Sequence, residues 1–239
     1  MSIPVSSPWR PRRNRDAERE LKREAVLRAA SQIFNEKGFQ ATTLDEIAAS
    51  LQVSKPTLYY YVESKDEILF ECVRTGLTML QQAIAEVDAK GGRAIDKLMA
   101  AMRKYGEIVT MDFGMCLIRV GEDPLPKEKR VQLRRMKAGI DHEFRQLITE
   151  AIEEGSIAPC DPRLAAFTVA GALSWIGRWY KPGGDLRPED IMTSMIQLLT
   201  QGLFVREAAA SPKPKRSGGV ARESRAGKAR SVSRRSGSK

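Results

Sequence analysis

Hydrophobic residues recur along most of this chain at intervals of three and four positions, which is the spacing of one face of an α-helix. The pattern is strong at 16–37, 66–89, 127–154 and 188–203. No segment shows the sustained alternation of hydrophobic and polar residues that is typical of a β-strand. Glycines and prolines separate the periodic segments, as Gly38 does after the first one. The sequence therefore predicts an all-α protein.

Two short helices joined by a tight turn are predicted between residues 42 and 61. Thr43 is a candidate N-cap, and Glu46 three positions later completes a capping box. Ser54 can cap the second short helix in the same way. Gln52 lies in the turn, so it must adopt there a backbone conformation that glycine would adopt at lower cost.

The second short helix, 55–61, carries an unusual set of side chains. Leu58 is its main buried anchor, so most of its polar and aromatic side chains, among them Lys55, Thr57 and the three tyrosines that follow Leu58, must face outward. A single helix fits the DNA major groove, where hydroxyl and ammonium groups bind phosphates and base edges. The alternative is an ordinary helical hairpin with tyrosines on its surface.

The stretch from Thr43 to Leu69 resembles the DNA-binding domain of TetR/AcrR-type transcriptional regulators. The matching positions are Thr43, Ile47, Ala48, Val53, Ser54, Leu58, Tyr59, Tyr61, Ser64, Lys65, Asp66 and Leu69. The chain departs from the family pattern at Gln52, usually glycine, and at Val62, often phenylalanine. The resemblance implies an N-terminal three-helix domain with a helix-turn-helix, and a C-terminal helical domain for ligand binding and dimerisation. It also implies a ligand-responsive repressor that is released from a palindromic operator on double-stranded DNA.

Four segments are expected on this basis. They are a disordered basic arm at 1–15, the DNA-binding domain at 16–65, an effector-binding and dimerisation domain at 66–208 that begins with a connector helix at 66–89, and a disordered basic tail at 209–239. The residues expected to contact DNA are Thr43, Lys55, Pro56, Thr57, Tyr59, Tyr60, Tyr61 and Lys65, with Arg12 and Arg13 from the arm. The phosphate contact of Lys65 is implied by the resemblance; the alternative is a solvated lysine near a helix cap.

The net charge of +10 is concentrated at the two ends of the chain. Residues 1–15 carry +4 and residues 211–239 carry +9, so the remainder is slightly acidic. Basic segments attract nucleic acid by releasing counterions, and a basic arm can also enter a minor groove. The alternatives are tails that only aid solubility, or a non-specific DNA-packaging protein that uses both tails.

The last two predicted helices, 164–180 and 188–203, are more apolar than packing in one shared core requires. The resemblance implies that they pair with a second copy in a two-fold dimer; the alternative is a monomeric bundle. The residues expected at this interface are Phe167, Gly171, Trp175, Trp179, Met192, Met195 and Leu199.

A ligand pocket is expected among the middle helices, where flexible and aromatic side chains are frequent. The expected effector-binding residues are Met102, Tyr105, Met111, Phe113, Met115, Arg119, Phe144, Trp175 and Arg178. Core packing is the alternative for each apolar one. Residues 175–184 resemble the W-x-x-R-W-Y-x-P-G-G signature of a TetR subgroup that includes regulators of lipid, sterol and short-acyl catabolism. This implies a small hydrophobic or acyl-CoA-type effector, with Arg119, Arg134, Arg135 or Arg178 as partners of its anionic groups; Arg178 could instead be structural.

Nothing in the sequence indicates catalysis. His142 is the single histidine, and the three cysteines lie far apart, so neither a metal site nor a cofactor is expected. A helical enzyme would need a polar constellation that the sequence does not show. There is no apolar run long enough to cross a membrane and no signal-peptide pattern at the N-terminus, so we expect a cytoplasmic protein without membrane contact.

Overall fold

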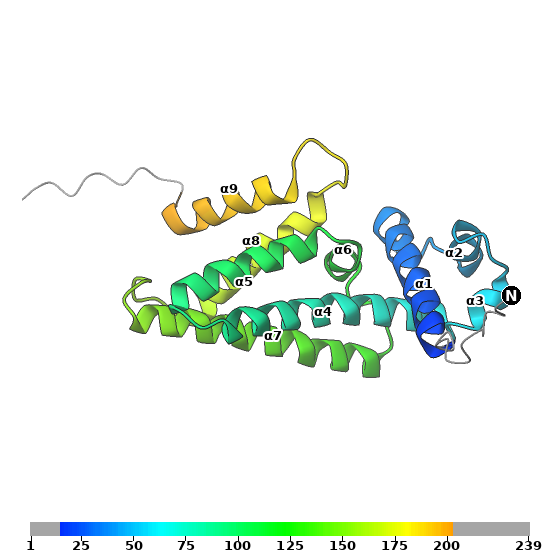
Figure 1. Ribbon diagram of the computed structural model, residues 1–239, viewed down its shortest axis with the longest axis horizontal. Coiled ribbons are helices and arrows are strands. Elements are labelled where there is room, and N and C mark those ends of the chain that lie inside the picture. Colours follow the sequence, from blue (N-terminus) through cyan, green and yellow to red (C-terminus); the bar gives the residue numbers. More distant parts are fainter. Residues whose placement is uncertain (1–14, 203–239) are drawn as a thin grey trace, which may run out of the picture. The chain divides into compact units, whose positions relative to one another are not determined.

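The computed structural model describes residues 15–202, and within that range it contains helices and no strand. Figure 1 shows their arrangement. The helices are α1 (Arg15–Lys37), α2 (Leu44–Ser50), α3 (Lys55–Tyr59), α4 (Lys65–Ala89), α5 (Ala94–Val109), α6 (Asp112–Arg119), α7 (Lys127–Glu153), α8 (Pro162–Trp179) and α9 (Pro188–Gln201). The predicted all-α fold is confirmed. The expected arm and tail lie outside the described residues, except for Arg15 at the start of α1.

Helices α1, α2 and α3 form a small three-helix unit. The Thr43 hydroxyl accepts a hydrogen bond from the Glu46 amide at 3.2 Å, and the Glu46 carboxylate accepts one from the Thr43 amide at 2.9 Å, so the predicted capping box is present. Gln52 has a φ of 55° and is the non-glycine residue with positive φ within 15–202. The turn therefore has the geometry that the missing glycine would favour, as expected.

Helix α3 is shorter than predicted, because it ends at Tyr59 instead of Tyr61. The amide of Tyr61 donates to the Leu58 carbonyl at 2.9 Å, and that of Val62 donates to the same oxygen at 3.2 Å. After the single helical turn of α3, the chain thus forms a tight turn at residues 60–62. Val62 is buried at the end of this turn.

Helix α4 connects this unit to the rest of the protein, because it contacts α1 as well as α5, α6 and α7. Its N-cap is Ser64, whose hydroxyl accepts from the Glu67 amide at 3.1 Å. The Glu67 carboxylate accepts from the amide of Glu63, one residue before the cap, and not from the amide of Ser64 as it would in a capping box. The cap is therefore extended by one residue at the junction between α3 and α4.

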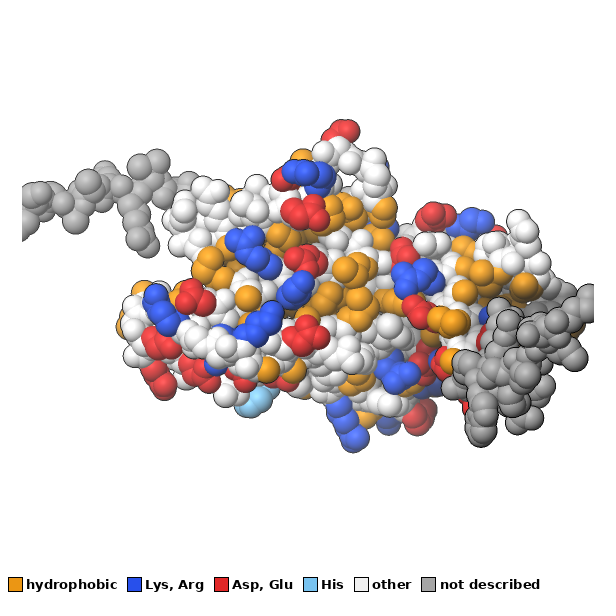
Figure 2. Space-filling view, viewed as in Figure 1, with side chains coloured by type: hydrophobic (Ala, Val, Ile, Leu, Met, Phe, Trp, Pro, Cys, Tyr) orange, Lys and Arg blue, Asp and Glu red, His pale blue; other side chains and the backbone are white. Residues whose placement is uncertain are grey.

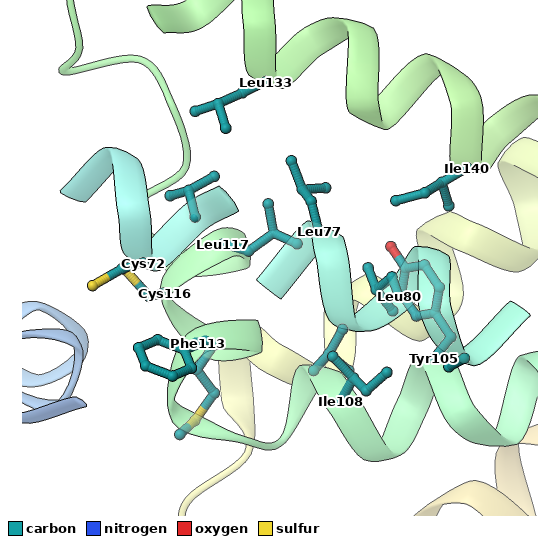
Figure 3. Close-up of a cluster of buried hydrophobic side chains, with 14 of the residues drawn as sticks. Cys72, Leu77, Leu80, Tyr105, Ile108, Phe113, Cys116, Leu117, Leu133 and Ile140 are labelled. Carbon is teal, nitrogen blue, oxygen red and sulfur yellow. The ribbon is translucent and has the colours of Figure 1, made fainter. Parts of the chain in front are cut away.

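The main core lies where α4, α5, α6 and α7 meet. Figure 3 shows Leu77 and Leu80 of α4, Tyr105 of α5 and Ile140 of α7 converging on this region. Helix α6 packs against both α4 and α1, and α8 packs against α5, α6 and α7. On the face seen in Figure 2, hydrophobic side chains gather around α6, whereas charged side chains of both signs are interspersed over α5.

Helix α9 packs on α5 of the same chain, which corrects one prediction. Met192 is 2% exposed, and a Cβ atom at Gly106 would lie 1.7 Å from its Sδ atom. The absence of a side chain at Gly106 thus makes room for Met192 inside the chain. Met192 was expected at a dimer interface, but it is an internal contact; Met195 and Leu199 remain partly exposed. No helix between residues 15 and 202 is long and apolar enough to cross a membrane.

Candidate functional site

The first candidate site is the outward side of α3. Leu58 is fully buried, whereas Tyr59 and Tyr60 are 49% and 66% exposed, which is the orientation expected from the sequence. Ser54 caps the helix, and its hydroxyl lies 2.8 Å from that of Thr57. The buried side chain of Leu58 and the hydroxyl pair at the N-terminus therefore hold this short helix in place. As a result, Tyr59 and Tyr60 have a defined orientation toward solvent.

Two neighbouring helices contact the exposed side chains of α3. Lys55 donates a 2.9 Å hydrogen bond to the carboxylate of Asp45 on α2, and this bond raises the pKa of Lys55. Arg19 on α1 lies over the Tyr60 ring at 5.5 Å, and Tyr61 contacts that ring edge-on at 5.1 Å. The sequence reasoning missed Arg19 and Asp45, because contacts between helices leave no signal in local spacing.

Lys65 is tied to the turn between α1 and α2. Its Nζ atom donates to the carbonyl oxygens of Phe39 and Thr42, each at 2.9 Å, and lies 4.4 Å from the centre of the Phe39 ring. Two of the three ammonium protons are therefore used within the protein. Its expected phosphate contact would have to use the remaining one.

The second candidate site is a cavity of about 270 Å³ in the helical body. Its walls come from α4, α5, α6, α7 and α8. They are formed by Leu77, Leu80, Tyr105, Leu117, Ile118, Lys137, Ile140, Asp141, Phe144, Ala166, Phe167, Ala170 and Ser174. Tyr105 and Ser174 share a hydrogen bond of 2.7 Å between their hydroxyl groups, and burial raises the pKa of the Tyr105 phenol. The cavity is thus mainly apolar, with one hydroxyl pair and two charged side chains.

The structure brings only part of the predicted effector set to this cavity. Tyr105 and Phe144 line it and contact each other edge-on, with ring centres 5.8 Å apart. Three predicted residues are buried in the core without lining it, namely Met102, Phe113 and Met115. Met111 is half-exposed and lines a different hollow, beside α1. The lining residues Leu77, Lys137 and Phe167 were missed as ligand contacts.

Arg119 does not line the cavity, in contrast to its expected place among the effector contacts. Its guanidinium donates to three backbone carbonyls: Gly177 at 2.8 Å, Tyr180 at 2.5 Å and Asn35 at 3.4 Å. Arg178 is exposed and donates to the Arg119 carbonyl at 3.3 Å, outside the cavity lining. Both arginines thus bond to the protein backbone where α6 and α8 meet.

A third candidate surface is the outer side of α8. Four predicted interface residues lie there and are exposed, namely Phe167, Gly171, Trp175 and Trp179. Leu164 continues the same stripe, and Trp175 is 65% exposed. A stripe of this kind is typical of a surface that another protein covers. Trp175 was also expected to contact the effector, but it does not line the cavity.

No cluster of metal-ligating side chains occurs in the part of the chain that the structure describes. His142 is exposed on α7. Cys72 and Cys116 are buried, and burial, followed by the neighbouring Cys116, raises the pKa of the Cys72 thiol well above its ordinary value. A thiol in this environment is mostly protonated at neutral pH and is therefore unreactive.

Two family descriptions match the chain. Residues 26–72 match "Bacterial regulatory proteins, tetR family", and residues 91–203 match "Tetracyclin repressor-like, C-terminal domain". Among individual relatives, the HTH-type transcriptional repressor KstR2 of Mycolicibacterium smegmatis is 24% identical over 190 residues, which cover 76% of this chain and 90% of the relative.

Solved structures with the same fold include two regulators. AibR, in a crystal structure with isovaleryl coenzyme A and operator DNA, is 25% identical, with a TM-score of 0.68 over 77% of this chain and 100% of its own. PfmR from Thermus thermophilus is 26% identical, with a TM-score of 0.69 over 75% of this chain and 99% of its own. The helix-turn-helix and the helical body described above are therefore those of a known family of regulators.

Proposed function

We propose, from the premise that this chain belongs to the TetR family of bacterial regulatory proteins, that it is a dimeric repressor released from operator DNA by a small hydrophobic effector. The relatives to which it is similar are described as transcriptional regulators. We therefore assign it a regulatory and not an enzymatic role, acting in the cytoplasm.

The observation that carries this proposal is the outward orientation of α3. Tyr59 and Tyr60 are exposed while Leu58 is buried, and Lys55 and Thr57 lie on the same short helix. We propose that this helix enters the major groove, where the tyrosines and Thr57 contact bases. Thr43, Pro56 and Lys65 would contact the DNA backbone, together with Arg12 and Arg13 of the N-terminal arm.

We propose further that the outer side of α8 forms the dimer interface. Phe167, Trp175 and Trp179 supply large apolar side chains, and Gly171 lets the two helices approach closely because no side chain separates them. Met195, Leu199 and the half-exposed Leu198 extend this surface along α9. Two copies of α3 would then face two half-sites of a pseudo-palindromic operator.

The effector is proposed to occupy the cavity beside Tyr105 and Phe144. The cavity is mainly apolar and slightly smaller than the ~300 Å³ at which ligand pockets usually begin, so it suits a compact hydrophobic group. The signature at 175–184 and the ligand named in the AibR structure both favour an acyl-CoA-type compound, of which the acyl part would enter. The domain division proposed is 16–65 for DNA binding and 66–208 for effector binding and dimerisation.

The direct test is a footprint of the purified protein on the DNA upstream of its own gene. We expect protection of a palindromic site, and loss of that protection when the effector is added. A ligand can cause this release only through a difference in its affinity for the two states of the protein. Absence of any sequence-selective protection would contradict the proposal.

A further inference from the structure

The cavity in the helical body has one cationic lining residue among those the structure describes, and that residue is Lys137 of α7. Asp141 is the other charged side chain in the wall, and its carboxylate already forms an ion pair with Arg145. The remaining walls are apolar, apart from the hydroxyl pair of Tyr105 and Ser174. An anionic group that enters this cavity can therefore bind to one ammonium group, that of Lys137.

That ammonium group is already held by a carboxylate of the protein. Lys137 donates a hydrogen bond to Oε2 of Glu122, and Arg134 lies 3.5 Å from the other carboxylate oxygen. The side chain of Glu122 is only 11% exposed, whereas that of Lys137 is 40% exposed. Burial acts to raise the pKa of Glu122, but the hydrogen bond and charge of Lys137, with help from Arg134, outweigh it and leave the pKa lowered. Glu122 is thus ionised at neutral pH and competes for Lys137.

We propose that the ligand is a compact apolar compound with an anionic group, and that this group takes Lys137 from Glu122. The apolar part would lie against Leu80, Tyr105 and Phe144. The anionic group can be a free carboxylate or a phosphate of a longer thioester, because either one accepts hydrogen bonds from an ammonium group. This inference rests on the proposed function and specifies how its effector is recognised.

The position of Glu122 gives this exchange a route toward the DNA-binding unit. Glu122 lies three residues after the end of α6. Helix α6 contacts α1: Gln32 donates to the Asp112 carboxylate at 3.0 Å, and Asn35 donates to the Asp112 carbonyl at 2.9 Å. When Lys137 turns to a ligand, Glu122 loses that ammonium group and keeps its own backbone amide and the more distant Arg134 as partners. The segment after α6 then loses one of its ion pairs with α7, which favours a different position of α6.

The test measures binding of three probes to the full-length protein by isothermal titration calorimetry: octanoate, octanoyl-CoA and the neutral 1-octanol. We expect the wild type to bind at least one anionic probe about tenfold more tightly than 1-octanol. Lys137→Gln should remove this preference, and Glu122→Gln should strengthen binding of the anionic probe several-fold, because the competitor has lost its charge. Lys104→Gln, which breaks an ion pair with Glu107 on α5 outside the cavity, is the control and should change nothing.

Lys137→Gln could unfold the protein by leaving Glu122 buried without its partner, so the double variant Lys137→Gln/Glu122→Gln is measured too. It keeps a hydrogen-bonding pair without charge and should fold but show no preference for anions. The inference is wrong if no probe binds, if 1-octanol binds as tightly as both anions, or if Lys137→Gln keeps the preference. Operator binding by the ligand-free protein is recorded in parallel, so that a failure here is separate from a failure of the proposed function.

Discussion

Lys65, the first residue of α4, donates a 2.9 Å hydrogen bond to the carbonyl of Phe39 while its ammonium group lies 4.4 Å from the centre of the Phe39 ring. One side chain thus joins the start of the connector helix to the turn that precedes α2. The same ammonium group also bonds the Thr42 carbonyl, next to the N-cap of α2. Lys65 therefore helps to fix the orientation of the helix-turn-helix relative to α4.

Replacing Lys65 by methionine should lower the free energy of unfolding by about 2 kcal/mol, because two carbonyls lose a charged donor. Operator binding and non-specific DNA binding should weaken by the same factor. Chemical denaturation gives the first quantity, and binding titrations at several salt concentrations give the second. A phosphate contact would also reduce the salt slope by about one; an unchanged slope would mean that the role of Lys65 is structural alone.

Gln52 should tolerate glycine but not a β-branched residue, because its φ of 55° lies in the left-handed region. We expect Gln52→Val to lower the free energy of unfolding by about 1–2 kcal/mol, and Gln52→Gly to leave it unchanged or slightly raised. Thermal unfolding of the two variants checks this. Equal stability of the two variants would contradict the geometry of the turn.

Tyr60 should contribute to operator selectivity and little to stability, since its side chain is 66% exposed. Tyr60→Ala is expected to weaken operator binding by about 1–3 kcal/mol for a lost base contact. Tyr60→Phe distinguishes the contribution of the ring to binding from that of the hydroxyl group, because this variant keeps the ring on which Arg19 lies. Fluorescence anisotropy with operator and scrambled duplexes measures both effects. If Tyr60→Ala binds the operator like the wild type, α3 is not oriented in the groove as proposed.

Substitutions at Trp175 and Met192 should affect different properties, namely dimerisation and stability. Trp175 is exposed on α8, whereas Met192 is buried against Gly106. Trp175→Glu should weaken dimerisation by at least about 2 kcal/mol, as central aromatic residues at interfaces do. Met192→Ala should leave the dimer intact but lower the free energy of unfolding by about 2–5 kcal/mol. Sedimentation equilibrium and denaturation distinguish the two. A dimer that survives Trp175→Glu unchanged would place the interface elsewhere.

The basic arm should supply much of the salt-dependent part of DNA binding. Residues 15–65 carry eight basic and eight acidic side chains, so the DNA-binding unit has no net charge of its own. Deleting residues 1–14 removes Arg10, Arg12 and Arg13, and should make the slope of log affinity against log salt shallower by up to about 3. Selectivity for the operator should persist. Loss of selectivity together with the slope would favour the DNA-packaging alternative.

Local signals were sufficient to predict most helices of this fold. Thr43 with Glu46, and Ser54 before Pro56, mark helix starts that depend only on neighbouring residues, and the structure confirms both. The orientation of α3 followed from a single apolar residue, Leu58, within a polar segment. These predictions succeeded because the interactions that decide them lie within one helical turn.

The errors concern contacts between distant segments. Met192 has the same apolar character as a true interface residue, and only the missing side chain of Gly106, 86 positions earlier, shows that it packs inside the chain. Lys137 was overlooked in favour of arginines, because the sequence does not show which cation faces a cavity. Such choices depend on how α5, α7 and α9 pack, which no local pattern contains.

The three hydrogen bonds from Arg119 to backbone carbonyls matter for the design of chimeric regulators. Its guanidinium holds the end of α8 through Gly177 and Tyr180, and reaches the Asn35 carbonyl at the end of α1. A chimera that joins the DNA-binding domain of another regulator to this effector-binding domain at residue 65 would place a different α1 beside this arginine. Chimeras whose α1 has the same length and a free carbonyl at that position should still release DNA when the proposed effector binds. Other chimeras should bind DNA but not respond to the effector.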